Sequence, residues 1–68
     1  MIKKIKRFGE SDSNNQWYEL DTGERIKCDE SIINTLWFDW VIRTDVHRKL
    51  VGDEIIFEYN KPVEIDLP

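Results

Sequence analysis

Apolar residues recur every three or four positions between Asp29 and Gly52, and this spacing is typical of an amphipathic α-helix. Asp29 is a favourable N-cap residue, and Gly52 stands where a left-handed residue ends many helices. The sequence therefore predicts one helix over residues 29–52, with residues 43–45 as the place where it could break. The stripe expected to face the core comprises Ile32, Ile33, Leu36, Trp37, Trp40, Val41, His47, Leu50 and Val51.

A strand competes with this helix over residues 36–43, where side chains are mostly β-branched or aromatic and apolar residues also fit an alternating pattern. The chain contains no alanine, which is the strongest helix former. The strand, however, leaves the N-cap residue Asp29 and the apolar residues on either side unexplained. We therefore favour the helix and keep a small all-β barrel as the alternative fold.

Residues 17–28 carry the clearest hairpin pattern. The connection Asp21-Thr22-Gly23 has three residues, and its glycine can take the positive φ that such a turn requires. Alternation along the strands would turn Tyr18 toward the core and Trp17 toward the other face of the sheet. Trp17 would then lie opposite Lys27, with its ring across the lysine stem.

The rest of the chain reads as three further strands. Residues 2–8 are rich in lysine, which is typical of an edge strand, and residues 9–16 are polar and predict a loop. Residues 53–59 and 63–67 alternate between apolar and polar side chains. Residues 60–62 separate them, and the proline there favours a sheet edge.

This order predicts an α+β fold of the form β-β-β-α-β-β, with a single amphipathic helix packed on a small, mainly antiparallel four- to five-stranded sheet. Residues 1–68 are expected to form one domain, near the lower size limit for a self-sufficient core. Cys28 is the only cysteine, so no intrachain disulfide can supplement that core, and self-association is the remaining means. The unpaired thiol and the lack of a signal peptide or membrane-spanning run favour the cytoplasm.

Candidate catalytic chemistry is sparse. Cys28 and His47 are the residues from which a nucleophile and a base would come, but a lone cysteine that faces the core is typically an inert apolar residue. Adjacent carboxylates on a strand point to opposite faces, and no spacing matches a metal site or a phosphate-binding loop. We therefore expect a non-enzymatic protein without a cofactor or metal.

A second apolar pair on the helix, Phe38 and Ile42, lies opposite the main stripe and beside Thr35. Either another segment covers this pair, or the pair is an exposed patch that binds a partner. The second alternative predicts a small regulator or inhibitor that binds another protein or a second copy of the chain. Glu64 and Asp66, on the acidic last strand, complete the partner-binding set of Phe38, Ile42, Thr35, Glu64 and Asp66. Nine isoleucines without any alanine are typical of an AT-rich genome, such as that of a phage or mobile element.

Single-stranded nucleic acid is the alternative partner. A basic track with one aromatic platform could hold a phosphate backbone and stack a base. The residues for this role are Lys3, Lys4, Lys6, Arg7, Trp17, Arg25 and Lys27. The net charge of −4 argues against it, and the basic strand could instead be neutralised by acidic neighbours in the sheet.

Overall fold

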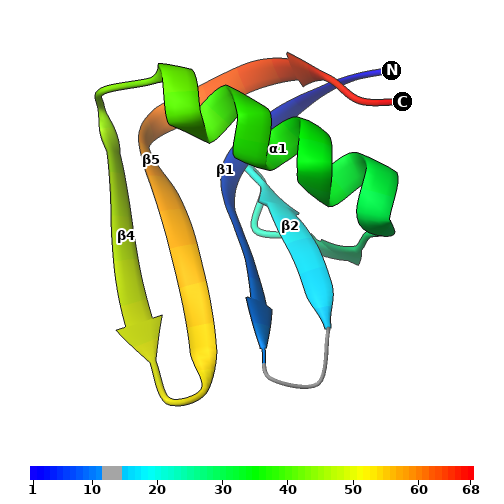
Figure 1. The fold of residues 1–68 in the computed structure, drawn as a ribbon. Helices are drawn as coiled ribbons and strands as arrows, with labels where there is room; N and C mark the ends of the chain where they lie inside the picture. The colour runs from blue at the N-terminus through cyan, green and yellow to red at the C-terminus, as the bar shows by residue number, and fades with distance from the viewer. Residues whose placement is uncertain (12–14) are drawn as a thin grey trace.

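The computed structural model describes residues 1–11 and 15–68, and it contains one helix packed on one face of an open five-stranded antiparallel sheet (Figure 1). This arrangement confirms the predicted α+β class and the β-β-β-α-β-β order, and it excludes the barrel. The strand order across the sheet is β3-β2-β1-β5-β4. The elements are β1 (Ile2–Ser11), β2 (Gln16–Leu20), β3 (Arg25–Lys27), α1 (Glu30–Ile42), β4 (Val46–Val51) and β5 (Glu54–Asp66).

The helix begins where the sequence predicts and ends ten residues earlier than Gly52. The Asp29 carboxylate accepts a hydrogen bond from the backbone N–H of Ile32 at 3.1 Å, which confirms the N-cap. The helix ends at Ile42 because Arg43 takes an extended backbone with φ −99° and ψ 149°. The prediction of a helix up to residue 52 is therefore wrong, and residues 43–45 are the point at which the helix stops.

Residues 46–51 form the edge strand β4, which pairs with the first half of β5. The two strands are joined by the two residues Gly52-Asp53, and Gly52 has a φ of +64°. A glycine with positive φ suits a hairpin turn as well as a helix end, so the local pattern was ambiguous. His47, Leu50 and Val51 consequently lie on a strand with exposed side chains and not on the helix stripe.

The strand β1 is longer and more central than predicted. It continues to Ser11 and lies between β2 and β5, so the prediction of an edge strand over residues 2–8 is wrong. Residues 9–11 of the predicted loop belong to this strand, Gln16 begins β2, and residues 12–14 lie outside the described residues. The start of this strand, Ile2 to Lys4, pairs with β5 alone, and β2 pairs with it only from Ile5 onward.

The two predicted final strands are one strand, β5, that bends at residues 60–62. The pairing with β1 jumps there, from Val63 opposite Ile5 to Glu58 opposite Arg7. The ammonium of Lys6 donates hydrogen bonds to the carbonyl oxygens of Tyr59 and Asn60, at 2.9 and 3.4 Å. These bonds occupy carbonyl groups that the bend frees from the ladder. Beyond this bend β5 pairs only with β1, so the proline there stands at a free edge, as the sequence predicted.

The core lies between α1 and the sheet. The predicted hairpin register, with Trp17 opposite Lys27, is confirmed, and it turns Tyr18 toward the helix. Phe57 is the centre of an aromatic group: Phe8 stacks on it and Trp40 meets it edge-on, both with ring centroids 4.9 Å apart. The buried core comprises Ile5, Phe8, Tyr18, Cys28, Ile33, Leu36, Phe57, Tyr59, Ile65 and Leu67.

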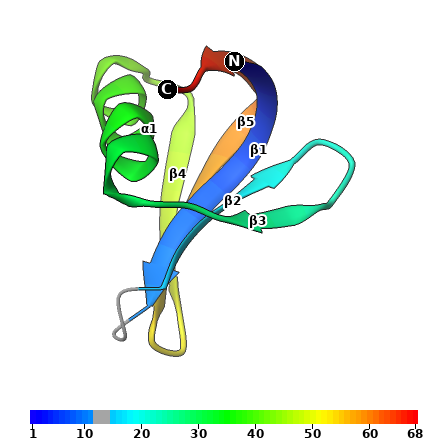
Figure 2. The ribbon, with the colours of Figure 1, turned by 90° about the vertical axis from the view of Figure 1, so that its right-hand side faces the viewer.

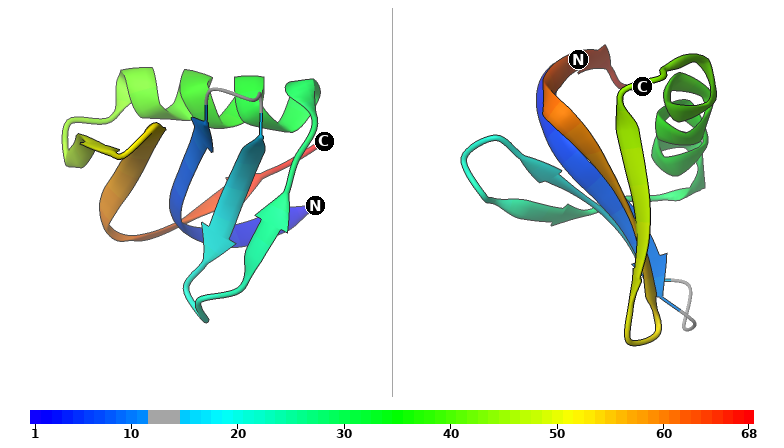
Figure 3. Two further views of the ribbon diagram at one scale, coloured as in Figure 1. Left: turned by 90° about the horizontal axis from the view of Figure 1, so that it is seen from below. Right: turned by 90° about the vertical axis from the view of Figure 1, so that its left-hand side faces the viewer.

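The two sides of the sheet are covered differently. Edge-on views show α1 on one face only, while the β2–β3 hairpin leans away from the helix (Figures 2 and 3). The lower half of the sheet, toward the β4–β5 turn, extends past the helix (Figure 1). The helix face of the sheet is therefore only partly covered.

Candidate protein-binding surface

The exposed side of α1 carries a row of large apolar residues. Phe38, Val41 and Ile42 are 77%, 72% and 70% exposed, and Trp37 is exposed beside them. We call these four residues the helix ridge. The expectation that Trp37 and Val41 face the core is wrong, because only Ile33 and Leu36 of the helix are fully buried and the helix touches the sheet along a narrow stripe.

The helix ridge lacks the charges that are usual on a solvent-facing helix surface. Of the exposed residues of α1, which the structure describes throughout, Glu30 alone is charged. Asp39 is engaged elsewhere: it accepts a hydrogen bond from Arg43 Nε at 2.7 Å and one from the Tyr59 hydroxyl at 2.8 Å. Burial, and then this bond to Asp39, raises the pKa of Tyr59. The network fixes the end of the helix to β5 and leaves the ridge uncharged.

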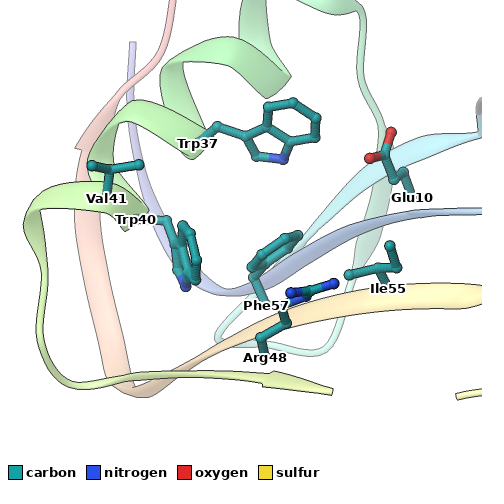
Figure 4. A pocket seen from close by; sticks show the side chains of 7 residues that line it. All are labelled: Glu10, Trp37, Trp40, Val41, Arg48, Ile55 and Phe57. Atoms are coloured by element: carbon teal, nitrogen blue, oxygen red, sulfur yellow. The ribbon is translucent and has the colours of Figure 1, made fainter. Parts of the chain in front are cut away.

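A cleft of about 270 Å³ lies between the helix and the uncovered part of the sheet. Figure 4 shows the indoles of Trp37 and Trp40 on the helix side and the Phe57 ring on the sheet. Glu10 and Arg48 stand on β1 and β4, the strands that flank β5. We call this space the α1 cleft, and its lining is Glu10, Trp37, Trp40, Val41, Arg48, Ile55 and Phe57.

A second, shallower hollow of about 510 Å³ lies on the other side of the ridge. Its lining includes Thr35, Phe38 and Ile42 from the helix and Ile65 from β5. Three of the five predicted partner-binding residues therefore come together here. The ridge thus stands between two hollows.

The other two predicted partner-binding residues lie elsewhere. Glu64 and Asp66 alternate with Ile65, which packs in the core, so they belong to the opposite face of the sheet. Asp66 also binds the N-terminal ammonium at 2.7 Å. The structure does not join these two carboxylates to Phe38 and Ile42.

The sequence pattern does not identify several residues of this surface. The apolar pattern predicts Trp37 and Val41 in the core, and it predicts no role for Glu10 or Arg48. No local signal marks the first two, because Trp37 and Val41 share the apolar stripe of the helix with its buried residues. The second two depend on strand pairing, which brings together residues nearly forty positions apart.

On the face of the sheet away from the helix, oppositely charged residues alternate across the strands. Arg25 pairs with Glu19 at 3.3 Å, and Arg7 pairs with Glu19 at 3.5 Å and with Glu58 at 3.0 Å. Lys49 pairs with Glu58 at 3.2 Å. We call Arg25, Glu19, Arg7, Glu58 and Lys49 the charge ladder. The expected neutralisation of the basic strand by acidic neighbours within the sheet therefore holds for Arg7.

The other predicted nucleic-acid-binding cations do not form one track. Lys4 lies 4.0 Å from Asp21, and Lys6 is held by backbone carbonyls at the bend of β5. Lys3 and Lys27 form no ion pair with a described residue, and they lie on strands that are separated by β2.

Trp17 is buried and does not offer a free stacking platform. The Arg25 guanidinium lies 3.7 Å from the centroid of its ring, so Arg25 and not Lys27 makes the cation–π contact. The indole N–H donates to Glu54 at 3.2 Å. The ring packs over Gly9, where an added Cβ would lie 2.8 Å from Trp17.

The cysteine and histidine considered for catalysis are far apart in the fold. Cys28 follows β3 and His47 belongs to β4, and these strands form the opposite edges of the sheet. Burial, with a smaller effect from the negative charge of Asp29, raises the pKa of the Cys28 thiol to about 11. The thiol is therefore protonated at neutral pH and a poor nucleophile. Over residues 1–11 and 15–68, no cluster of three or more metal-ligating side chains occurs.

No family model, no curated protein and no solved structure matches this chain. Within the part of the chain that the structure describes, no helix has the length and apolar character needed to cross a membrane. Function must therefore be inferred from the surface of the molecule, and the helix ridge with its two hollows is the part of that surface that internal contacts do not account for.

Proposed function

We propose that this protein is a non-enzymatic protein-binding module and that the helix ridge is its contact surface. The observation that carries this proposal is the exposure of Phe38, Val41 and Ile42, adjacent on one helix face, each by more than two-thirds. Exposed apolar surface costs about 25 cal/mol per Å² relative to burial. Contiguous apolar patches on small proteins are usually contact sites.

The uncharged surroundings of the ridge support the same conclusion. Asp39, the one charged residue in the middle of the helix, is engaged by Arg43 and Tyr59. A partner that covers the ridge therefore has no charge to desolvate at its centre, which is the usual composition of an interface core. A module of this size acts by occupying a surface of its partner, as small regulators and inhibitors do.

The setting that we infer is the cytoplasm, where the unpaired Cys28 would stay reduced. The composition rich in isoleucine and free of alanine fits a regulator or inhibitor encoded by a phage or mobile element. Both inferences depend on composition and are secondary to the binding surface.

Nucleic-acid binding has less support. Arg7 and Arg25 are paired with carboxylates in the charge ladder, and Trp17 is buried beneath Arg25. A phosphate backbone would have to displace these ion pairs, and a base would have to displace the guanidinium. We therefore place the binding function on the helix side of the molecule.

Affinity capture with matched variants tests the proposal. The protein, its Phe38→Glu variant and its Ile2→Glu variant are immobilised and exposed to lysate of the source organism. Ile2 is the control because it is also apolar and 67% exposed, but it lies on β1 away from the ridge. We expect the native chain and Ile2→Glu to retain the same protein, and Phe38→Glu to lose it.

Circular dichroism and thermal unfolding establish that each variant is folded. Retention of the same protein by all three chains would contradict the proposal. Unfolding of Phe38→Glu alone would also contradict it, because Phe38 would then be part of the core and not of a contact surface.

A further inference from the structure

We infer that the partner seated on the helix ridge is a second copy of this chain, in a two-fold symmetric dimer. This inference rests on the proposed function, because it uses the same surface. In a two-fold interface the same surface patch of both copies is in contact, so the patch must be complementary to itself in shape and charge.

The shape of the surface meets this condition. The ridge projects between the α1 cleft and the second hollow, and Trp37 and Val41 belong to both the ridge and the cleft wall. A ridge of helix side chains packs into a neighbouring groove when two helices meet. Two copies related by a two-fold axis over the α1 cleft can each place Trp37 and Val41 against the cleft of the other.

The charges around the cleft are also self-complementary. Glu10 and Arg48 flank the apolar floor on opposite sides, since their strands lie on either side of β5. Arg48 forms no ion pair with a described residue, and Glu10 accepts only a 3.5 Å hydrogen bond from Gln16 among the described side chains. A two-fold axis that passes between Glu10 and Arg48 brings Glu10 of each copy toward Arg48 of the other. The two pairs then offset the repulsion between chains of net charge −4.

The apolar area is close to what such a contact needs. An aromatic side chain can bury roughly 150–250 Å². The ridge therefore supplies several hundred Å² in each copy, and the 71% exposed Leu50 extends it, because it pairs with Ile55 at the cleft. A stable interface buries about 800 Å² in each partner, so the ridge and the cleft together approach that size.

Sedimentation equilibrium over a wide concentration range tests the dimer. The native chain is expected to pass from monomer to dimer, and Phe38→Glu is expected to weaken dimerisation by roughly a hundredfold, as for a central interface residue. Ile2→Glu should dimerise like the native chain. A native chain that stays monomeric at all concentrations would overturn the inference, as would a dimer that Phe38→Glu leaves intact.

Charge reversal tests the two-fold geometry. Glu10→Arg alone and Arg48→Glu alone should each weaken dimerisation by roughly tenfold at low salt, because both pairs become repulsive. An equimolar mixture of the two variants should recover native affinity, because in the mixed dimer both contacts join opposite charges. Failure of the mixture to recover affinity would overturn the proposed arrangement.

The two proposals fail in different ways. A monomeric chain that still captures a different protein through Phe38 would overturn the dimer and leave the proposed function standing. A monomeric chain whose capture is insensitive to Phe38→Glu would overturn both.

Discussion

The two faces of the sheet differ in whether their side chains find partners within the chain. On the face away from the helix, the charge ladder pairs cations with carboxylates across all five strands, and Trp17 is closed between Gly9 and Arg25. On the helix face, the ridge and the α1 cleft remain apolar and open. The charged side chains of the first face pair within one chain, whereas the second face leaves large apolar side chains exposed. The same comparison explains why the basic residues, prominent in the sequence, are not the best candidates for a site.

The sharpest test compares two neighbouring residues of α1. Leu36 is fully buried and Phe38 is 77% exposed. Leu36→Ala should lower the free energy of unfolding by about 2–5 kcal/mol through the cavity it leaves. Phe38→Ala should change it by less than about 0.5 kcal/mol in the monomer. Urea unfolding at low protein concentration measures both, and a large loss in Phe38→Ala would mean that the ridge belongs to the core.

A second test concerns the closed face. An added Cβ at Gly9 would lie 2.5 Å from the carbonyl oxygen of Ile55 and 2.8 Å from the Trp17 ring. We expect Gly9→Ala to lower the free energy of unfolding by about 1–3 kcal/mol, because the backbone of β5 must move.

Gly23→Ala is the matched control for Gly9. Nothing lies within 4 Å of the Cβ that it would add, but its φ of +94° disfavours alanine. The expected loss of about 1 kcal/mol comes from the backbone alone. Thermal unfolding of the two variants separates the effects, and an equal loss in both would argue against close packing of Trp17 on Gly9.

A third test measures how alkaline pH lowers the free energy of unfolding through the buried groups Cys28 and Tyr59. Burial raises the pKa of the Cys28 thiol from its ordinary 9.0 to about 11, and burial with the bond to Asp39 raises the pKa of Tyr59. A group whose pKa is raised in the folded state stabilises the fold below its unfolded pKa, and this stability is lost as the pH rises.

The free energy of unfolding should therefore fall between pH 9 and pH 11, because the Cys28 thiol ionises in the unfolded chain before it ionises in the folded one. Urea unfolding across this range measures the decline, and Cys28→Ala should flatten its first part. A decline of the same size at the same pH in Cys28→Ala would show that the thiol is not responsible.

The last test concerns the charge ladder. Arg7→Met removes the cation between Glu19 and Glu58, with which it pairs at 3.5 and 3.0 Å. We expect a loss of about 1 kcal/mol at low salt, because partly exposed ion pairs contribute little and two carboxylates are left facing each other. The loss should shrink in high salt, since salt screens that repulsion. Unfolding at two ionic strengths gives the result, and a loss independent of salt would point to packing.

Local signals in the sequence predicted local structure well. The Asp29 N-cap and the register of the 17–28 hairpin depend on neighbouring residues, and both are confirmed. The placement of Phe38 and Ile42 on the outer side of the helix depends only on helical period, and their exposure follows. These features need no information from distant parts of the chain.

Strand pairing decided the rest. Residues 46–51 could continue a helix or form a hairpin around Gly52, and the backbone hydrogen bonds of β5 settle the choice. The same pairing made β1 central and joined the two predicted final strands. It also set Glu10 and Arg48 on either side of the cleft. By itself the sequence determined the α+β class, the helix start, the hairpin and the outward pair on the helix. The tertiary structure alone decided where the helix ends, which strands are central and that the helix leaves part of one face uncovered. The physical reason is that bonds between distant strands outweigh the small differences in local propensity.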